Sequence, residues 1–392
     1  MHRGPFARFV TGPATAALVA LSILGCDTPA GTGGPAVSGG AGSAAPTFVE
    51  GPGGSGGPTG APGPSGLGTA ATPTRPVALP WAEVESALAS PSAREDHTWT
   101  VAEGGHDAWL FGGRDGGTVY DDLWAFNLGT NAWRRVVVQG VAPAARFGHE
   151  AAWVPGLGLV VFGGQAGSTF FDDLWLFAPD PGSDSGSWRL LPPGGGAPIA
   201  RYGSCSGIGP DGRFWISHGF TSDGVRFADT LAYDFASESW SDQAPATERP
   251  VERCLHACWW RSDGRLALYG GQTTGVPALG DLWFLTPGSG AATNRWSEAA
   301  GQAPDPRQLP AIARHGNATF LFGGRGTDRA ALGETWLATD AGTGFERFQT
   351  PGGDPPARSG ATLIDDLTGD RLLLFGGLGS EAFGDLWELS FR

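Results

Sequence analysis

The chain lacks clustered positive charge and long apolar runs. Its 392 residues carry 39 acidic and 25 basic side chains, a formal net charge of −14, and no run of basic residues. Nucleic-acid binding depends on phosphate neutralisation by clustered basic side chains, so this composition argues against nucleic acid as a partner. Methionine occurs once and tyrosine four times, whereas tryptophan occurs 16 times. No segment is long and apolar enough to span a bilayer as a helix.

Residues 1–26 resemble a bacterial lipoprotein signal peptide. Arg3 and Arg8 supply a positive start, residues 14–24 are apolar, and Cys26 follows the small residue Gly25. The resemblance implies an exported lipoprotein of the cell envelope, periplasmic or on the outer surface, anchored in the membrane through a lipid at Cys26. An ordinary cleaved signal peptide is the alternative.

Residues 27–76 consist almost wholly of Gly, Pro, Ser, Ala and Thr. Such a segment has no apolar side chains to bury, so the sequence predicts a disordered tether there. The remaining residues, 77–392, are expected to form one folded domain.

A glycine pair recurs along this domain at a nearly constant interval. Its first positions are Gly112, Gly163, His218, Gly270, Gly323 and Gly376, with a histidine in the third copy. The separations are 51, 55, 52, 53 and 53 residues, and Asp-Leu-Trp follows most copies. A period near ~50 residues indicates a repeat architecture in which each unit buries its faces against its neighbours.

Each repeat contains four short apolar segments separated by turn residues. They are rich in β-branched and aromatic residues, and Asp211-Gly212, Asp263-Gly264 and His315-Gly316 lie where tight hairpins are expected. Together with the phased glycine pairs, these signatures resemble the kelch family. The resemblance implies an all-β fold, a six-bladed β-propeller with four antiparallel strands per blade.

The last repeat ends after its third strand, and the N-terminal segment supplies a fourth. Trp81 precedes Arg94 by 13 residues, which is the spacing between the outer-strand aromatic and the next arginine in four of the other repeats. We therefore expect residues 81–84 to form the outer strand of the last blade and to close the ring.

One arginine begins every repeat. The six are Arg94, Arg146, Arg201, Arg253, Arg307 and Arg358. They could ring the channel mouth and hold an anionic ligand. The structural alternative is favoured, because every repeat also carries a carboxylate that arginine can bind in bidentate fashion. These acidic residues are Asp122, Asp173, Asp229, Asp281, Glu334 and Asp385.

Neither a metal nor a cofactor is expected. His97, His149 and His256 each follow their arginine by three residues, but no zinc-type Cys/His spacing accompanies them. The glycine pairs lack the Lys-Ser/Thr and helix of a phosphate loop. Galactose oxidase-like kelch propellers imply copper held by a Tyr/His/Cys set, and the four tyrosines here are scattered over three repeats.

Function is expected where the repeats differ, in the loops after the glycine pairs. The ligand-binding candidates are Arg114, Gln165, Asp223, Gln272, Arg325 and Arg329. The third repeat departs furthest, with His218 in the glycine position and Thr230-Leu231 in place of Leu-Trp. That departure indicates either a specialised site or drift.

The cysteines of the folded domain suggest one disulfide. Cys254 and Cys258 are four residues apart on one strand, about 13 Å, too far to pair with each other. Cys205 and Cys258 lie at similar heights on neighbouring inner strands, four and five residues after their arginines. We expect a Cys205–Cys258 disulfide and a free Cys254.

Taken together, the sequence predicts a monomeric, membrane-anchored kelch propeller that binds a protein or a glycan at its loop face. One alternative is a carbohydrate-active enzyme, such as a sugar mutarotase or epimerase, with its site at the channel mouth. The other is a structural envelope protein without a discrete ligand.

Overall fold

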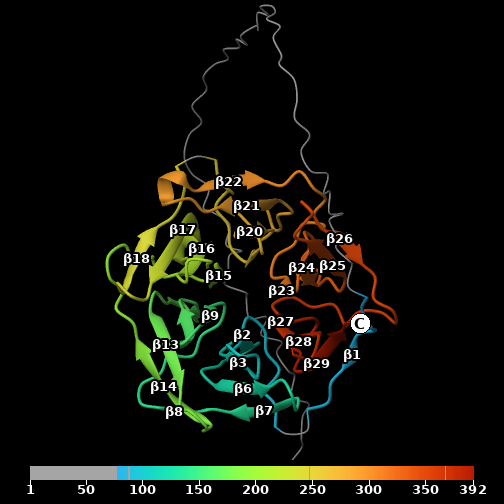
Figure 1. Cartoon of the computed structure of the whole chain (residues 1–392). Helices are drawn as coiled ribbons and strands as arrows, with labels where there is room; N and C mark the ends of the chain where they lie inside the picture. Colours follow the sequence, from blue (N-terminus) through green and yellow to red (C-terminus); the bar gives the residue numbers. More distant parts are fainter. Residues whose placement is uncertain (1–76, 87–88, 247, 367) are drawn as a thin grey trace, which may run out of the picture.

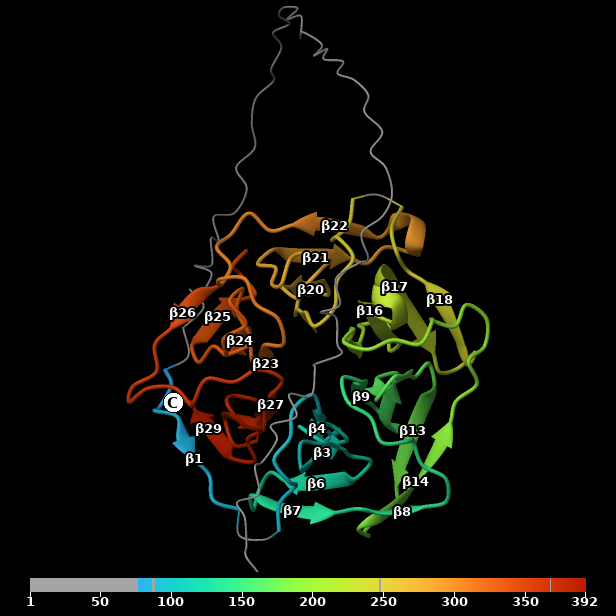
Figure 2. The same ribbon diagram turned by 180° about the vertical axis from the view of Figure 1, so that it is seen from behind.

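Six four-stranded antiparallel sheets surround a central axis like the blades of a propeller (Figure 1). The structure is a computed structural model that describes residues 77–86, 89–246, 248–366 and 368–392. Seen from behind, the same six sheets form a complete ring (Figure 2). The predicted fold class is confirmed. The signal peptide, Cys26 and the tether lie outside the described residues.

The strands of the first three blades, from the axis outward, are as follows. Blade 1 contains β2 (Thr98–Val101), β3 (Asp107–Phe111), β6 (Leu123–Asn127) and β7 (Ala132–Arg135). Blade 2 contains β9 (Glu150–Val154), β10 (Gly158–Phe162), β13 (Leu174–Pro179) and β14 (Ser185–Leu190). Blade 3 contains β15 (Cys205–Ile208), β16 (Phe214–Phe220), β17 (Arg226–Asp234) and β18 (Ser239–Asp242).

The other three blades repeat this order. Blade 4 contains β19 (Ala257–Trp260), β20 (Leu266–Tyr269), β21 (Leu282–Thr286) and β22 (Arg295–Glu298). Blade 5 contains β23 (Ala311–His315), β24 (Ala318–Phe322), β25 (Thr335–Thr339) and β26 (Glu346–Phe348). Blade 6 contains β27 (Thr362–Asp366), β28 (Arg371–Phe375), β29 (Leu386–Ser390) and β1 (Ala82–Glu83).

A few short elements lie outside this scheme. Two small hairpins follow the glycine pairs of blades 1 and 2: β4 (Arg114–Asp115) with β5 (Thr118–Val119), and β11 (Gln165–Ala166) with β12 (Thr169–Phe170). β8 (Val137–Gln139) adds a fifth, parallel strand to blade 2. Single 3₁₀ turns occur at Ser222–Gly224 and Ala291–Thr293. Across the described part of the chain, no helix has the length and apolar character that crossing a membrane requires.

The N-terminal strand β1 pairs with β29. Ala82 lies opposite Glu388 and Glu83 opposite Trp387, in antiparallel orientation. The contact extends beyond the two-residue strand, because Arg392 N donates to Val77 O at 2.9 Å. The outer position of blade 6 is thus occupied by residues that precede blade 1 in the sequence.

Aromatic side chains on the outer strands fill the junctions between blades. Trp133 of blade 1 lies 5.1 Å from Phe375 of blade 6, and Trp240 of blade 3 lies 5.3 Å from Phe162 of blade 2. Trp81 lies 5.9 Å from Phe322 of blade 5, so it takes the equivalent place for blade 6. Burying one indole contributes about 5 kcal/mol to stability before the conformational entropy cost of ordering the side chain is subtracted. These rings are therefore a main source of the adhesion between blades.

Hydrogen bonds also join each blade to the next at the glycine pairs. In all six junctions, the backbone N–H of the second residue of the pair donates to the carbonyl oxygen of the next blade's arginine, at 2.8 or 2.9 Å. Gly113 donates to Arg146, and Gly377 of the last blade donates to Arg94 of the first. Five blades carry glycine at the first position of the pair, where φ is positive and a Cβ on Gly112 would lie 2.6 Å from the Arg146 carbonyl oxygen; in blade 3, His218 takes this position with a φ of 60°.

A covalent link joins blades 3 and 4. Cys205 on β15 and Cys258 on β19 form a disulfide with a Cα–Cα distance of 5.7 Å. The expected Cys205–Cys258 pairing is confirmed, whereas the expectation of a free Cys254 is not, because no cysteine of the described residues is a free thiol. Comparing cysteines at similar heights on neighbouring inner strands gives no information on the state of Cys254.

Replacement of Trp81 by Ala tests whether β1 holds the ring together. The side chain is 7% exposed, and its indole Nε1 donates to Thr335 Oγ1 at 3.4 Å. We expect Trp81→Ala to lower the melting temperature by about 5–10 °C, because large-to-small changes of buried Trp cost about 3–5 kcal/mol. Val141→Ala, at an exposed position, is the control. Thermal unfolding of Trp81→Ala at the wild-type temperature would refute a closing role for this strand.

Candidate functional site

The six repeat arginines are wholly buried. Their exposed fractions are 0 or 1%. Arg94 is representative: Nε donates to Ser92 O, Nη1 donates to Gly112 O at 2.9 Å, and the two Nη atoms bind the Asp122 carboxylate at 2.6 and 3.0 Å. Arg307 differs only in binding Glu334 through a single nitrogen, at 2.7 Å.

These arginines are not a ligand-binding ring. Every guanidinium is occupied by a carboxylate and backbone carbonyls, and no anion in solvent can reach it. This burial and pairing fit the structural role that we favoured for Arg94, Arg146, Arg201, Arg253, Arg307 and Arg358 over the anionic-ligand alternative. Burial alone would raise the pKa of Asp122, but the hydrogen bonds and charge of Arg94 outweigh it and hold that pKa below its usual value.

The Asp-Leu-Trp motif belongs to the same hydrogen-bonded network of arginine and carboxylate. The indole Nε1 of Trp124 donates to Asp122 Oδ2 at 2.7 Å, and the tryptophans of blades 2, 4 and 6 bind their aspartates at 2.7 or 2.8 Å. Blade 3 has Thr230-Leu231 instead. There, Ser217 Oγ bonds to His218 Nδ1 at 2.7 Å and to Thr230 Oγ1 at 3.0 Å. His218 is fully buried, so the departure of blade 3 from the repeat pattern changes the interior of the blade and creates no site that a ligand can reach.

The histidines three residues after the arginines point between blades. His97 packs edge-on against Phe375 of blade 6, His149 against Phe111 of blade 1, and His256 against His218 of blade 3. Burial is the main cause that lowers the pKa of His97 and His256 to about 3, so both are neutral. Within the described residues no group of three His, Cys, Asp or Glu side chains could hold a metal ion.

The mouth of the channel carries a polar cluster, the mouth cluster, made of Glu95, Asp96, Arg114, Tyr202 and Arg325. Arg114, on β4, bonds to Asp96 Oδ2 at 2.9 Å and to Glu95 Oε1 at 3.2 Å. Tyr202 donates its hydroxyl to Asp96 Oδ2 at 3.5 Å. Below the cluster, the channel encloses a cavity of about 140 Å³.

Aromatic rings support this cluster from below. The Arg114 guanidinium lies 4.1 Å from the centre of the Phe147 ring, and Phe147 meets Tyr202 edge-on at 5.5 Å. The Arg114 side chain is still 21% exposed. It is thus fixed in orientation and remains open to a partner.

Burial changes the charge of the mouth cluster. Desolvation, followed by the neighbouring Asp96, raises the pKa of Glu95 to about 8, although Arg114 and Arg325 oppose the shift. Glu95 is therefore mostly uncharged at neutral pH. Asp96 is then the one carboxylate left to balance two guanidinium groups.

The structure separates the six loop candidates into three kinds. Arg114 and Arg325 meet at the mouth cluster, where Arg325 Nη2 donates to Ser359 Oγ at 3.4 Å. Gln165 and Gln272 are 2% exposed and turn inward, with Gln165 Nε2 bonded to Gly167 O and Gln272 Nε2 to Cys254 Sγ. They are poor ligand-binding residues. Asp223 and Arg329 are exposed at loop tips.

Sequence reasoning missed Glu95, Asp96 and Tyr202. Glu95 and Tyr202 each follow their blade's arginine directly, where the other blades carry Phe147, Cys254, Gln308 and Ser359. The two consecutive acidic residues after Arg94 were the available signal. Their convergence with Arg325, which is 230 residues away in the chain, depends on the closed ring.

Comparison with known proteins agrees with this geometry. The KLHDC2/KLHL20/DRC7 Kelch-repeats domain matches residues 74–271 and 244–392. The chain belongs to the kelch-repeat family. Similar proteins include Kelch domain-containing protein 3 of Bos taurus, 28% identical over 267 residues that cover 65% of this chain and 66% of that protein.

Two plant proteins are also similar to this kelch chain. Adagio-like protein 3 of Oryza sativa subsp. japonica is 28% identical over 52% of the chain, and F-box/kelch-repeat protein At1g51550 of Arabidopsis thaliana is 26% identical over 62%. The matches span about a third and about half of those two proteins, and about two thirds of the bovine one. The match to the family model establishes the family, and the likeness to these proteins leaves the partner open.

The raised pKa of Glu95 predicts a pH-dependent stability. Between pH 4.5 and about 8 the folded state holds a proton on Glu95 that the unfolded state does not. The resulting stability is fully present below pH 4.5 and is lost as pH rises through 8. We expect the free energy of unfolding of Glu95→Gln, relative to that of the wild type, to rise by a few kcal/mol as pH increases over this range. The expected rise is about 1.4 kcal/mol per pKa unit.

Denaturant unfolding at pH 5, 6.5 and 8.5 measures this gain. Glu381→Gln, at an exposed loop position, is the matched control and should differ from wild type by the same amount at every pH. A constant difference for Glu95→Gln would contradict the shifted pKa.

Proposed function

We propose that this kelch propeller binds a protein through the face that carries the mouth cluster. The observation that carries the proposal is the pair Arg114 and Arg325, held beside a Glu95 that is mostly neutral at pH 7. A carboxylate of a partner would find guanidinium donors already oriented. Charge-assisted hydrogen bonds of this kind are worth about 1.5–3 kcal/mol each. Kelch propellers generally bind protein partners, which supports the same conclusion.

Capture experiments with the full-length protein test this proposal. Wild type, Arg114→Ala and Arg325→Ala would be cross-linked to proteins of the native cell envelope and compared by mass spectrometry. A partner of the mouth should be lost at least tenfold with either variant. It should be retained by Arg347→Ala, a control on the outer strand β26. Equal capture by all four proteins, or no capture by wild type, would sink the proposal.

A glycan at the mouth and an enzyme acting there are the other candidates. The enzyme is favoured by one observation, the protonated Glu95 beside Arg114, because a general acid needs a pKa near the working pH. A glycan array screened with Arg114→Ala, Arg325→Ala and Glu95→Gln, followed by a turnover assay on any glycan that binds, distinguishes these cases. A binding face shows graded loss on single changes, whereas an enzyme loses turnover entirely with Glu95→Gln.

We also propose that a lipid at Cys26 anchors the protein in the cell envelope, as an exported bacterial lipoprotein. The support is the sequence of residues 1–26, with its basic start, short apolar run and Gly25-Cys26. Detergent phase partitioning of full-length protein is the measurement: wild type should enter the detergent phase and Cys26→Ser the aqueous phase. Identical partitioning would remove the anchor.

A further inference from the structure

A second concavity lies on the opposite face from the mouth cluster. It measures about 840 Å³ and opens between blades 1 and 2. Its walls are the turn between β2 and β3, the turn between β6 and β7, and the turn between β13 and β14. Because β3 and β10 both run from this end of their blades to the glycine pairs, the concavity and the mouth cluster lie at opposite ends of the strands.

Two tryptophans and one arginine line the inner surface of this concavity. Trp109 of β3 and Trp153 of β9 stack with ring centres 6.1 Å apart and planes inclined by 22°. The Arg134 guanidinium lies 5.7 Å from the Trp109 ring. Trp153 is only partly buried, so it offers apolar surface to an occupant.

The rim is polar, and each of its charged groups already makes an ion pair or a hydrogen bond. Arg134 donates from its two Nη atoms to the Asp107 carboxylate at 3.1 and 3.0 Å, and its Nε lies 2.8 Å from Asp184 Oδ1. Glu103 Oε2 accepts from Gly156 N, and Asp180 Oδ2 accepts from Ser185 Oγ. These carboxylates retain further lone pairs that can accept hydrogen bonds.

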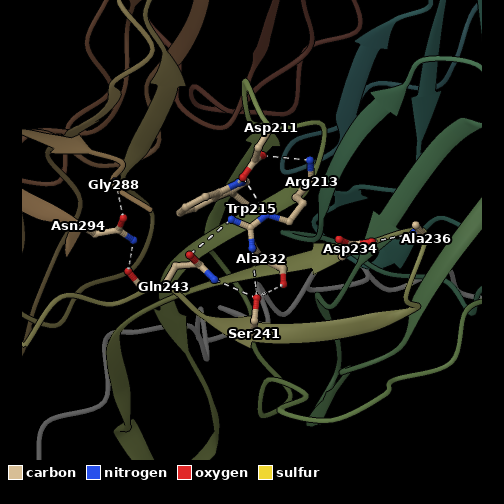
Figure 3. Close-up of polar contacts among 10 residues, drawn as sticks. All are labelled: Asp211, Arg213, Trp215, Ala232, Asp234, Ala236, Ser241, Gln243, Gly288 and Asn294. Carbon is tan, nitrogen blue, oxygen red and sulfur yellow. Dashed lines mark hydrogen bonds and ion pairs between the residues drawn. The ribbon is translucent and has the colours of Figure 1, made fainter. Parts of the chain in front are cut away.

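The junction between blades 3 and 4 contains an equivalent tryptophan pair, in which the protein itself supplies an acceptor for one indole N–H. Trp215 stands three residues before its glycine-pair position, as Trp109 does, and it meets Trp260 at 5.4 Å. There, Trp215 Nε1 donates to Asp211, Arg213 donates to Ser241 and Gln243, and Asn294 donates to the Gln243 carbonyl (Figure 3). By contrast, no described residue accepts from Trp109 Nε1, whereas Trp153 Nε1 and its counterpart Trp260 Nε1 both lack an acceptor among these residues.

We propose that the concavity between blades 1 and 2 binds a neutral saccharide. The partly exposed Trp153 offers an apolar surface for one face of a sugar ring, and the rim carboxylates and Arg134 offer acceptors and a donor for its hydroxyl groups. Sites that combine aromatic surface with a few placed polar groups are typical of small-ligand binding, and the volume lies within their usual range of about 300–1,000 Å³.

Charge selects among ligand classes. Arg134 already lies over Trp109, so a cationic ligand could stack only on Trp153. Asp107 and Asp184 are already bound to Arg134. An anion would meet Glu103, Asp180 and Asp184 at the rim. A neutral ligand with many hydroxyl groups avoids the repulsion from the rim carboxylates and uses donors and acceptors alike.

The probe is an array of neutral oligosaccharides of one to three units, followed by calorimetric titration of the best binder with full-length protein. We expect Trp153→Ala to weaken binding at least tenfold, and Ser183→Trp, which adds bulk at the exposed rim, to do the same. The matched control is Trp260→Ala, since Trp260 lies seven residues after its blade's arginine, as Trp153 does. It should leave the affinity within twofold, as should Arg114→Ala at the mouth.

Three results would overturn this proposal. One is the absence of binding by any neutral oligosaccharide at millimolar concentration. Another is preferential binding of an arginine-rich hexapeptide or a uronate oligosaccharide, each run as a parallel arm. The third is an equal loss of affinity in Trp153→Ala and Trp260→Ala with unaltered melting temperatures. Since Arg114→Ala affects only the mouth, failure here leaves the protein-binding proposal to its own test.

Discussion

The ring depends on the arginine that begins each blade. Its guanidinium joins the third strand of its own blade, through the carboxylate, to the end of the second strand, through a carbonyl oxygen. Its own carbonyl oxygen receives the N–H of the preceding blade's glycine pair. A buried charge is costly to desolvate and tolerable only when fully bonded. Arginine, carboxylate and glycine pair therefore form one unit, and the arginine keeps its carboxylate and its carbonyl even where His218 replaces the first glycine or Glu334 the aspartate.

This unit explains why so much of the fold could be predicted. The spacing of the arginines and glycine pairs reveals the repeat, and the acidic residue with its tryptophan reveals what the arginine binds. Even the place of Trp81 follows from the 13-residue interval, since the indole lies against Phe322 as the other outer aromatics lie against their preceding blades. Residues that recur in every repeat meet structural requirements that can be recognised within a single repeat.

The site was less predictable, for a physical reason. Gln165 and Gln272 resemble Arg114 in sequence position, and only side-chain packing shows that they turn inward. The mouth cluster takes residues from blades 1, 3 and 5, and the pKa of Glu95 depends on charges that the closed ring brings together. The concavity between blades 1 and 2 likewise depends on how two turns of one blade face one turn of the next. No local segment of the sequence shows that these residues lie close together in the folded chain.

The hydrogen bonds at the blade junctions have a topological consequence. Gly377 bonds to Arg94 as every other pair bonds to the arginine after it, and Arg392 N lies 2.9 Å from Val77 O. The folded domain is therefore nearly cyclic in space, although the chain is linear. Its covalent break falls within blade 6, between the outer strand and the other three, and the ring does not distinguish that blade from its neighbours. Domains whose ends lie together tolerate circular permutation, so an exposed turn in any blade could carry the termini instead.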